Sequence, residues 1–312
     1  MTEIILHHYP MSPFAEKIRL IMGYKKLQWN SIIIPSIMPK PDVIALTGGY
    51  RRTPILQVGA DIYCDTVLIA RVLEEIKNSP TLFPAKHKMA ASAAAAWADL
   101  HVFMAGVVHA SQPTGAKTLF AHLNETEMTA FREDRAAFRK GPTVRPDASQ
   151  ARAFLLSTLR QMETQFETGA KFIVGDGPSI ADFSFYHGLW FILRAGPMAD
   201  ILDRYPRVHD WLDRIKAFGH GESHEMSSAA AITVAKNAVP MGDVVGAMEL
   251  PEGIAIGDRV SIMPADYGQD PTAGDLVLAQ PDEIAIRRTD ERAGTVVVHF
   301  PRTGFQIAKS AA

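Results

Sequence analysis

The sequence of 312 residues predicts three units in order: an α/β domain, an all-helical domain and a small, barrel-like all-β domain. In residues 1–78, short apolar runs of strand length alternate with amphipathic helical segments. Residues 85–220 contain alanine-rich and periodic segments of the kind that form packed helices. Residues 239–312 contain short β-like runs with turn residues between them. A chain of this length exceeds one average domain, which agrees with the division.

A strand–helix–strand unit opens the first domain. The apolar run over residues 4–6 predicts a strand. Ser12 is a favourable N-cap and Pro13 suits the first helical position, so we expect a helix to begin there. A second strand is expected over residues 31–35.

A hairpin and a helix follow after an irregular link. The run 54–58 predicts a strand that begins on Pro54, which costs little because the missing N–H is lost only at the first position. Turn residues separate this strand from a second one over 61–64. Asp65 then precedes an apolar stripe with spacings of three and four, so it lies near the cap of a helix. The order strand, helix, strand, link, strand, strand, helix is that of a thioredoxin-like domain.

Helices dominate the second unit, which follows a proline-bounded linker. Ser179 and Asp182 have the spacing of a capping box, with aspartate in place of the usual glutamate. We assign this box a structural role. Helices are expected over 86–109, 125–139 and 148–168, from Ser179 to about 193, and around Trp211.

The sequence pattern changes from helical to β-like near the end of the chain. Residues 219–225 are polar and contain glycine and histidine, so we expect a loop there, followed by one short helix over 226–237. Beyond Val239 the β-like runs begin. They cover 259–263, 275–278, 283–287 and 295–300.

Composition limits the class of protein. A hydrophobic content of 47% and a charged content of 21% are ordinary for a globular protein. The net charge of −2 gives no electrostatic reason to expect nucleic acid or an anionic membrane as partner. We expect no membrane span and no signal peptide. The single cysteine fits a reducing compartment, so a cytoplasmic location is expected.

The eleven histidines do not predict a metal centre. The closest pairs are His7 with His8 and His220 with His224, and neither pair is joined by a cysteine or by an HExxH pattern. We therefore expect no metal.

Three short motifs give a family resemblance. Residues 11–20, Met-Ser-Pro-Phe-Ala-Glu-Lys-Ile-Arg-Leu, are similar to the active-site turn of omega-like glutathione transferases, which carry Cys-Pro-Phe-Ala-Glu there. Thr53-Pro54 resembles the cis-proline step of that superfamily, and Asp65-Thr66 resembles its acidic–hydroxyl pair. The capping box at Ser179 resembles one in its helical domain. The motifs occur in the family's order.

The resemblance implies a glutathione-dependent enzyme and a homodimer. Ser12 would stabilise the glutathione thiolate, and the backbone at Thr53 and Pro54 would pair with the cysteinyl residue. Asp65 and Thr66 would hold the γ-glutamyl end. Because serine replaces cysteine at position 12, no mixed disulfide can form there, so thiol transfer is not expected. Conjugation, peroxide reduction and lyase chemistry stay open.

Several alternatives stay open at these positions. The alternative for Ser12 and Asp65 is that each is a plain helix cap, and the alternative for Pro54 is an ordinary strand-opening proline. His8 or Tyr9 is a rival for the thiol; neighbours on a strand point to opposite faces, so at most one of them enters the cleft. Further candidates for the site are Phe14 in the turn motif and, for the glycyl carboxylate, Lys40, Arg51 and Arg52.

The leading functional hypothesis is a glutathione transferase, with glutathione as co-substrate, that acts on a small apolar electrophile or peroxide. A second hypothesis is a non-catalytic module of the same fold that binds apolar ligands. A third is an interaction protein in which the terminal β domain docks a partner or completes a dimer.

Overall fold

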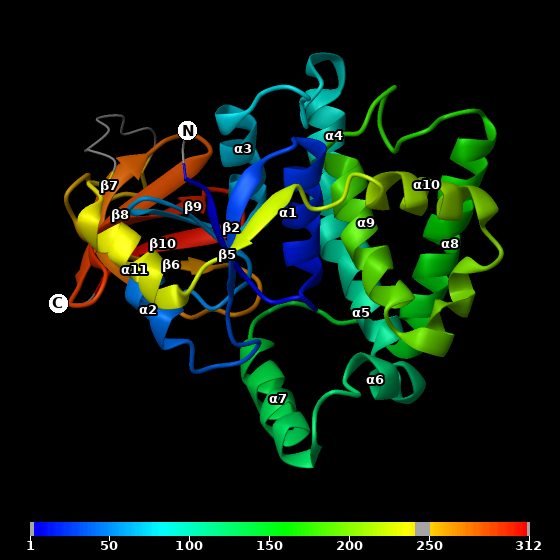
Figure 1. Ribbon diagram of the computed structural model, residues 1–312, viewed down its shortest axis with the longest axis horizontal. Coiled ribbons are helices and arrows are strands. Elements are labelled where there is room, and N and C mark those ends of the chain that lie inside the picture. Colours follow the sequence, from blue (N-terminus) through cyan, green and yellow to red (C-terminus); the bar gives the residue numbers. More distant parts are fainter. Residues whose placement is uncertain (1–2, 241–249, 311–312) are drawn as a thin grey trace.

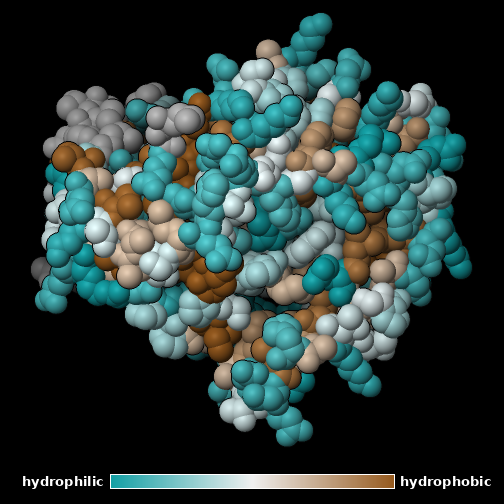
Figure 2. All heavy atoms as spheres, viewed as in Figure 1, coloured by the Kyte–Doolittle hydropathy of each residue, from teal (hydrophilic) through white to brown (hydrophobic). Residues whose placement is uncertain are grey.

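The computed structural model describes residues 3–240 and 250–310 (Figure 1). In Figure 1 the β-rich part lies to one side, the helical domain lies to the other, and α1 stands between them. Figure 2, from the same side, shows the surface hollowed above α7, where Figure 1 places the connection between β1 and α1.

The first domain has the predicted thioredoxin-like order. β1 pairs in parallel with β2 and antiparallel with β3, and β3 forms a hairpin with β4. The elements are β1 (Ile5–His8), α1 (Pro13–Tyr24), β2 (Gln28–Ile33), α2 (Pro41–Thr47), β3 (Ile55–Val58), β4 (Asp61–Cys64) and α3 (Thr66–Ile76).

The irregular link that we expected before β3 contains α2, so that expectation is wrong over residues 41–47. Pro41 occupies the start of α2, and Gly48 ends it in the left-handed conformation at φ 81°. Both residues are ordinary boundary signals, but the helix is only seven residues long and shows little periodicity.

The helical domain confirms the predicted long helices and adds short ones. A π-helical turn interrupts the first long helix, between α4 and α5. The structure adds α6 and the 3₁₀ segments, which have too few turns to show a clear apolar face. The elements are η1 (Ala85–His87), α4 (Lys88–Trp97), η2 (Ala98–Val102), α5 (Phe103–Ala110), α6 (Pro113–Leu119), α7 (Glu125–Phe138), α8 (Ala148–Glu167), α9 (Ile180–Leu193), η3 (Gly196–Leu202) and α10 (Pro206–Lys216).

One helical stretch contradicts the expectation that no segment is apolar and long enough to span a bilayer. Ala85–Ala110, 26 residues, passes that test by length and composition. Its alanines explain the result, since they raise the hydropathy while serving close packing against α8 and α9. A core helix of a globular protein passes the same test, so the finding is weak evidence for a span.

The strand-rich region at the end of the chain is confirmed, and its strands continue the sheet of the first domain. β9 pairs in parallel with β4, from Asp61 opposite Val297 to Tyr63 opposite His299. Within the described residues one sheet of ten strands results, in the order β10-β6-β7-β8-β9-β4-β3-β1-β2-β5. The new elements are β5 (Glu222–Glu225), α11 (Ser228–Asn237), β6 (Arg259–Pro264), β7 (Thr272–Ala279), β8 (Glu283–Asp290), β9 (Gly294–Pro301) and β10 (Phe305–Lys309).

The segments that precede the terminal strands agree with the prediction in part. The loop expected over 219–225 contains β5, which pairs in parallel with β2. All four residues of β5 are exposed and polar, so no apolar pattern marks the strand. The helix over 226–237 is confirmed as α11. Part of the expected β domain, residues 241–249, lies outside the described residues.

The core has two parts, one on each face of the sheet. Leu6 and Leu56 pack with α1, α3 and the helical domain. Their neighbours Ile5 and Ile55 pack on the opposite face with α2, α11 and the terminal strands. Alternation of side chains along a strand produces this division. The first domain is therefore buried between two different covers.

Candidate functional site

The register of the sheet gathers the predicted motifs at one edge. His7 lies opposite Ile55, and Ile55 lies opposite Cys64. The segment after β1, the segment before β3 and the segment after β4 therefore leave the sheet side by side. They carry Ser12, Thr53 and Asp65 respectively.

Ser12 is the N-cap of α1. Its backbone is extended, with φ −75° and ψ 118°, and its side chain is only 2% exposed. The Oγ atom accepts a hydrogen bond of 3.2 Å from the N–H of Ala15. Among the described residues the hydroxyl proton of Ser12 has no acceptor, so capping leaves it available to a ligand.

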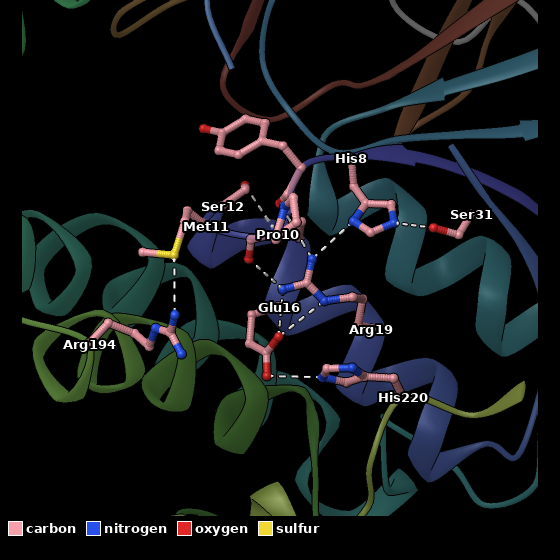
Figure 3. A network of polar contacts seen from close by, with 11 residues as sticks. His8, Pro10, Met11, Ser12, Glu16, Arg19, Ser31, Arg194 and His220 are labelled. Atoms are coloured by element: carbon pink, nitrogen blue, oxygen red, sulfur yellow. Dashed lines mark hydrogen bonds and ion pairs between the residues drawn. The ribbon is translucent and has the colours of Figure 1, made fainter. Parts of the chain in front are cut away.

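Arg19 holds the turn that carries Ser12 (Figure 3). Its Nη2 donates to the carbonyl oxygen of Pro10 at 3.0 Å and to Oε2 of Glu16 at 2.6 Å. The other Glu16 oxygen lies 3.1 Å from the Nε2 of His220, which follows α10. A guanidinium donates in a fixed plane. Arg19 therefore holds the segment before Ser12, through Pro10, and the first turn of α1, through Glu16.

His8 has both ring nitrogens engaged. A guanidinium only donates, so His8 Nδ1 accepts from Arg19 at 3.0 Å, and its Nε2–H donates to Ser31 Oγ at 2.9 Å. Burial and the nearby Arg19 charge lower the pKa of His8 to about 3. Figure 3 shows the ring directed to Ser31, away from Ser12. The next residue, Tyr9, is half-buried, and its ring centre is 5.7 Å from Lys40 Nζ.

Thr53 and Lys40 form the middle of the site. The Thr53–Pro54 peptide bond is cis, as the family resemblance implies. Among residues 3–240 and 250–310, the main-chain N–H and C=O of Thr53 form no hydrogen bond. Lys40 is buried, and its ammonium donates to Thr53 Oγ1 at 3.2 Å and to the carbonyl oxygen of Arg51 at 3.4 Å.

The ammonium of Lys40 therefore has only neutral hydrogen-bond acceptors within the described part of the chain. Burial and then repulsion from Arg135 lower the pKa of Lys40 to about 8. A carboxylate brought beside this ammonium would raise its pKa again and give it a charged partner. Lys40 is suited to bind an anionic group.

Asp65 and Thr66 form the start of α3. Asp65 has φ 73° and ψ 138°. Residues other than glycine avoid this region of backbone conformation because it is strained. Its side chain accepts from Val67 N–H at 2.9 Å, and burial raises the pKa of its carboxyl group. Thr66 is 5% exposed and its Oγ1 accepts from Lys17 Nζ at 3.4 Å. The free amides of this helix start favour an anion.

Two family models match the chain. Residues 6–81 match the glutathione S-transferase N-terminal domain, and residues 145–214 match the glutathione S-transferase C-terminal domain. A crystal structure of a GST-like protein from Pseudomonas syringae is 42% identical, with a TM-score of 0.84. The alignment covers 99% of this chain and 100% of that one. The chain belongs to the glutathione S-transferase superfamily. A search of curated proteins gives no match.

Likeness to more distant structures is a likeness of fold alone. A glutathione S-transferase from Rhodospirillum rubrum F11 is 20% identical, with a TM-score of 0.52 over 69% of this chain and 88% of that one. Glutathione S-transferase III in apo form is 19% identical, with a TM-score of 0.51 over 69% and 92%.

Three polar residues, of which Lys17 and His187 are buried and Asp99 is partly exposed, join the first domain to the helical domain, and sequence reasoning missed them. Lys17 Nζ lies 2.6 Å from Asp99 Oδ2, and Asp99 Oδ1 lies 2.9 Å from His187 Nε2. Burial would raise the pKa of Asp99, but Lys17 and His187 together outweigh it and lower that pKa to about 2. Phe14 packs beside them, with its ring centre 4.5 Å from that of His187 and 4.6 Å from that of Phe103. These residues come from separate elements, so no local pattern connects them.

Arg51 and Arg52 lie close to the other predicted residues, but both are engaged. Arg51 Nη2 lies 2.6 Å from Asp134 Oδ1 of α7. Arg52 Nη2 contacts the Asp266 carboxylate and the carbonyl oxygen of Tyr267. These partners belong to the helical domain and to the loop between β6 and β7, so segments far apart in the sequence meet beside Thr53.

Another hollow of the molecule lies away from these residues. It is an open groove of about 1400 Å³ whose lining includes Tyr24, Trp29 and Phe218. None of the predicted site residues lines it. We therefore place the site by chemistry and register at the edge that carries Ser12 and Thr53.

Proposed function

We propose that the protein is a glutathione transferase in which Ser12 stabilises the thiolate of glutathione for attack on a small apolar electrophile or peroxide. One observation carries the proposal. Thr53 and Ser12 lie at the same end of the strands. Within the described residues the main-chain N–H and C=O of Thr53 form no hydrogen bond, and the hydroxyl proton of Ser12 has no acceptor. A tripeptide laid along this edge would pair with Thr53 and bring its sulfur to Ser12.

The two charged ends of glutathione would have separate partners. The start of α3 suits the γ-glutamyl end, because Thr66 offers N–H and hydroxyl donors and Asp65 offers a carboxylate for the ammonium. Lys40 suits the glycyl carboxylate, since its ammonium has only neutral partners. Arg52 was a rival for that carboxylate; its contacts to Asp266 and Tyr267 favour Lys40 instead.

The reaction needs an ionised sulfur. A free thiol has a pKa above neutrality, and the thiolate is the nucleophile. The Ser12 hydroxyl would donate to the sulfur, and the amides at the start of α1 would favour its negative charge. The thiolate then attacks the electrophile, and the leaving group departs with the bonding electrons. The half-buried apolar side chains of Met11 and Phe14, on either side of Ser12, suit an apolar substrate.

Calorimetry with glutathione, followed by turnover assays with 1-chloro-2,4-dinitrobenzene and cumene hydroperoxide, tests the proposal. Saturable binding with turnover is expected. Binding without turnover on either substrate would favour the non-catalytic module, and no binding would refute both. The homodimer and the cytoplasmic location expected from the sequence belong to the same proposal, and analytical ultracentrifugation tests the dimer.

A further inference from the structure

The loop between β6 and β7, residues 265–271, brings the strand-rich region to the site. We propose that Tyr267 in this loop is a glutathione-binding residue whose hydroxyl donates to the α-carboxylate of the γ-glutamyl group. The inference rests on the proposed function, because it assumes that glutathione occupies the start of α3. It adds a ligand-binding role for a part of the chain that lies outside both matched family domains.

Arg52 connects the loop to the γ-glutamyl end of the site. Its Nη2 contacts the Asp266 carboxylate and the carbonyl oxygen of Tyr267, while its Nη1 lies 3.9 Å from Asp65 Oδ2. One guanidinium thus lies between the strained residue before α3 and the loop. Arg52 acts here as a positioning residue, because its contacts fix the loop rather than a ligand.

The ring of Tyr267 is held from two sides. The Arg52 guanidinium carbon lies 4.2 Å from the ring centre, and the Phe138 ring meets it edge-on with centres 5.2 Å apart. The loop backbone is fixed to the end of α7 as well, since the N–H of Gly268 donates to the carbonyl oxygen of Phe138 at 2.9 Å. A Cβ at Gly268 would lie 2.6 Å from the Phe138 ring, so glycine permits this approach.

The hydroxyl of Tyr267 has no hydrogen-bond partner among the residues that the structure describes. Burial raises its pKa to about 12, with Arg52 opposing and the Asp266, Asp65 and Asp99 carboxylates adding to the rise. The phenol therefore stays protonated, and in this partly exposed residue it is free to donate to a ligand. Its surroundings already contain carboxylates, but the Asp65 carboxylate accepts from Val67 instead.

A carboxylate that arrives with the ligand would give the Tyr267 hydroxyl an acceptor. The γ-glutamyl carboxylate of a glutathione bound at Thr66 would lie beside Asp65, whose carboxylate is 3.9 Å from the guanidinium of Arg52 that stacks on the Tyr267 ring. A neutral phenol can approach a carboxylate without the repulsion that Asp65 itself would exert, and a hydrogen bond to a charged group is among the stronger ones.

Calorimetry on the full chain tests the inference with Tyr267→Phe, glutathione and γ-aminobutyryl-cysteinyl-glycine, which is glutathione without the α-carboxylate. Loss of a hydrogen bond to a charged group should weaken glutathione binding by about tenfold. The analogue should lose less than about twofold, because it lacks the acceptor. Tyr24→Phe is the matched control, since its hydroxyl donates to the carbonyl oxygen of Thr81 away from the site; it should bind both ligands as the wild type does.

The outcomes separate the two proposals. If the wild type does not bind glutathione, the proposed function fails, and this inference fails with it. If the wild type binds and Tyr267→Phe binds glutathione equally well, or loses affinity equally for both ligands, the inference alone is overturned. Hydrogen exchange on the wild type gives a second test that needs no variant: glutathione should slow exchange in residues 265–271, and unchanged exchange there would refute the role of the loop.

Discussion

The four strands of the first domain gain a neighbour at each edge, and the two additions differ. On the β4 side, β9 is buried from Val296 to Pro301 and leads to four further strands. On the β2 side, β5 is a single strand of four exposed residues. The same backbone pairing therefore serves two purposes: the first addition builds a second core, whereas the second only covers an edge.

A buried charge cluster marks the β4 side. His299 on β9 has a side chain with no exposed surface; its Nε2 lies 3.1 Å from Asp61 Oδ1 and its Nδ1 lies 2.7 Å from Glu283 Oε1. The ring stacks on Tyr63 of β4 with centres 4.4 Å apart. An imidazolium that donates from both nitrogens connects three strands. On the β2 side, His224 is 60% exposed and lies 3.5 Å from Glu222, a pair of little energetic weight.

Removal of the strand-rich region should have the largest effect. A chain that ends at Asn237 loses β6–β10 and uncovers Ile62 and Cys64, which share a core with those strands. We expect loss of cooperative folding rather than a smaller active enzyme. Circular dichroism during heating checks this. A cooperative transition at the temperature of the full chain would show that the β4 edge needs no cover.

His299→Ala should cost about 3 kcal/mol of unfolding free energy, because it leaves a cavity and two carboxylates without their common partner. Denaturation in urea measures the change. His224→Ala is the matched control on the β2 side and should stay within about 0.5 kcal/mol of the wild type, since surface substitutions rarely exceed that. Equal losses of unfolding free energy in the two variants would show that the β4 side and the β2 side do not differ in their contribution to stability.

Ser12→Ala should separate turnover from glutathione binding. Loss of the donor to the thiolate is expected to lower kcat by about a hundredfold, or about 2.7 kcal/mol in the barrier, with the affinity for glutathione little changed. Steady-state kinetics and calorimetry measure the two quantities. Because Ser12 also caps α1, the substitution should lower the unfolding free energy by about 1 kcal/mol, less than His299→Ala does. A Ser12→Ala variant with full turnover would assign the chemistry to another residue.

A smaller, pH-dependent effect should appear at the β4 side alone. Burial lowers the pKa of His299, but hydrogen bonds to Asp61 and Glu283 outweigh it and raise that pKa above its ordinary value of 6.5. The stabilisation is therefore complete below pH 6.5 and is lost as the pH rises through the higher folded-state pKa. His7 has the opposite sign, because burial lowers its pKa to about 4 and its contribution is lost on acidification.

The measurement is the difference in unfolding free energy between the wild type and His299→Gln from pH 6 to pH 9. This difference should shrink as the pH rises, because His299 of the wild type loses its positive charge, whereas the glutamine of the variant is neutral at every pH. A constant difference over that range would mean that His299 is neutral in the folded protein throughout.

Local signals explain why the first domain was predictable and β5 was not. Ser12 with Pro13, and Asp65 before a periodic stripe, mark their helices by capping and spacing. β5 exists only because β2 offers backbone partners, so its sequence of Glu-Ser-His-Glu carries no strand pattern. The docking of β9 on β4 had a partial signal: the run from Val296 to Phe300 is apolar apart from His299, which is close to the pattern of strands buried on both faces.

The candidate site divides in the same way. Ser12, Thr53 and Asp65 each lie in a motif that is read within a few residues. Lys17, Asp99 and Tyr267 reach the same place from α1, a π-helical turn and a distant loop, and only the packing of domains brings them together. Pairings across such distances follow from tertiary structure, which no local pattern encodes.

The order of the sheet also determines where the molecule is open to unwanted association. A strand with unpaired backbone groups is a template on which another chain can add. β4 has partners on both sides, so the open borders lie at β10 and β5. Those two strands carry charges, Lys309 on one and Glu222 and Glu225 on the other. Charged residues on an outer strand oppose strand-to-strand aggregation, so this arrangement protects the two sides of the sheet. The ends of the strands, where Ser12 lies, stay free for a ligand.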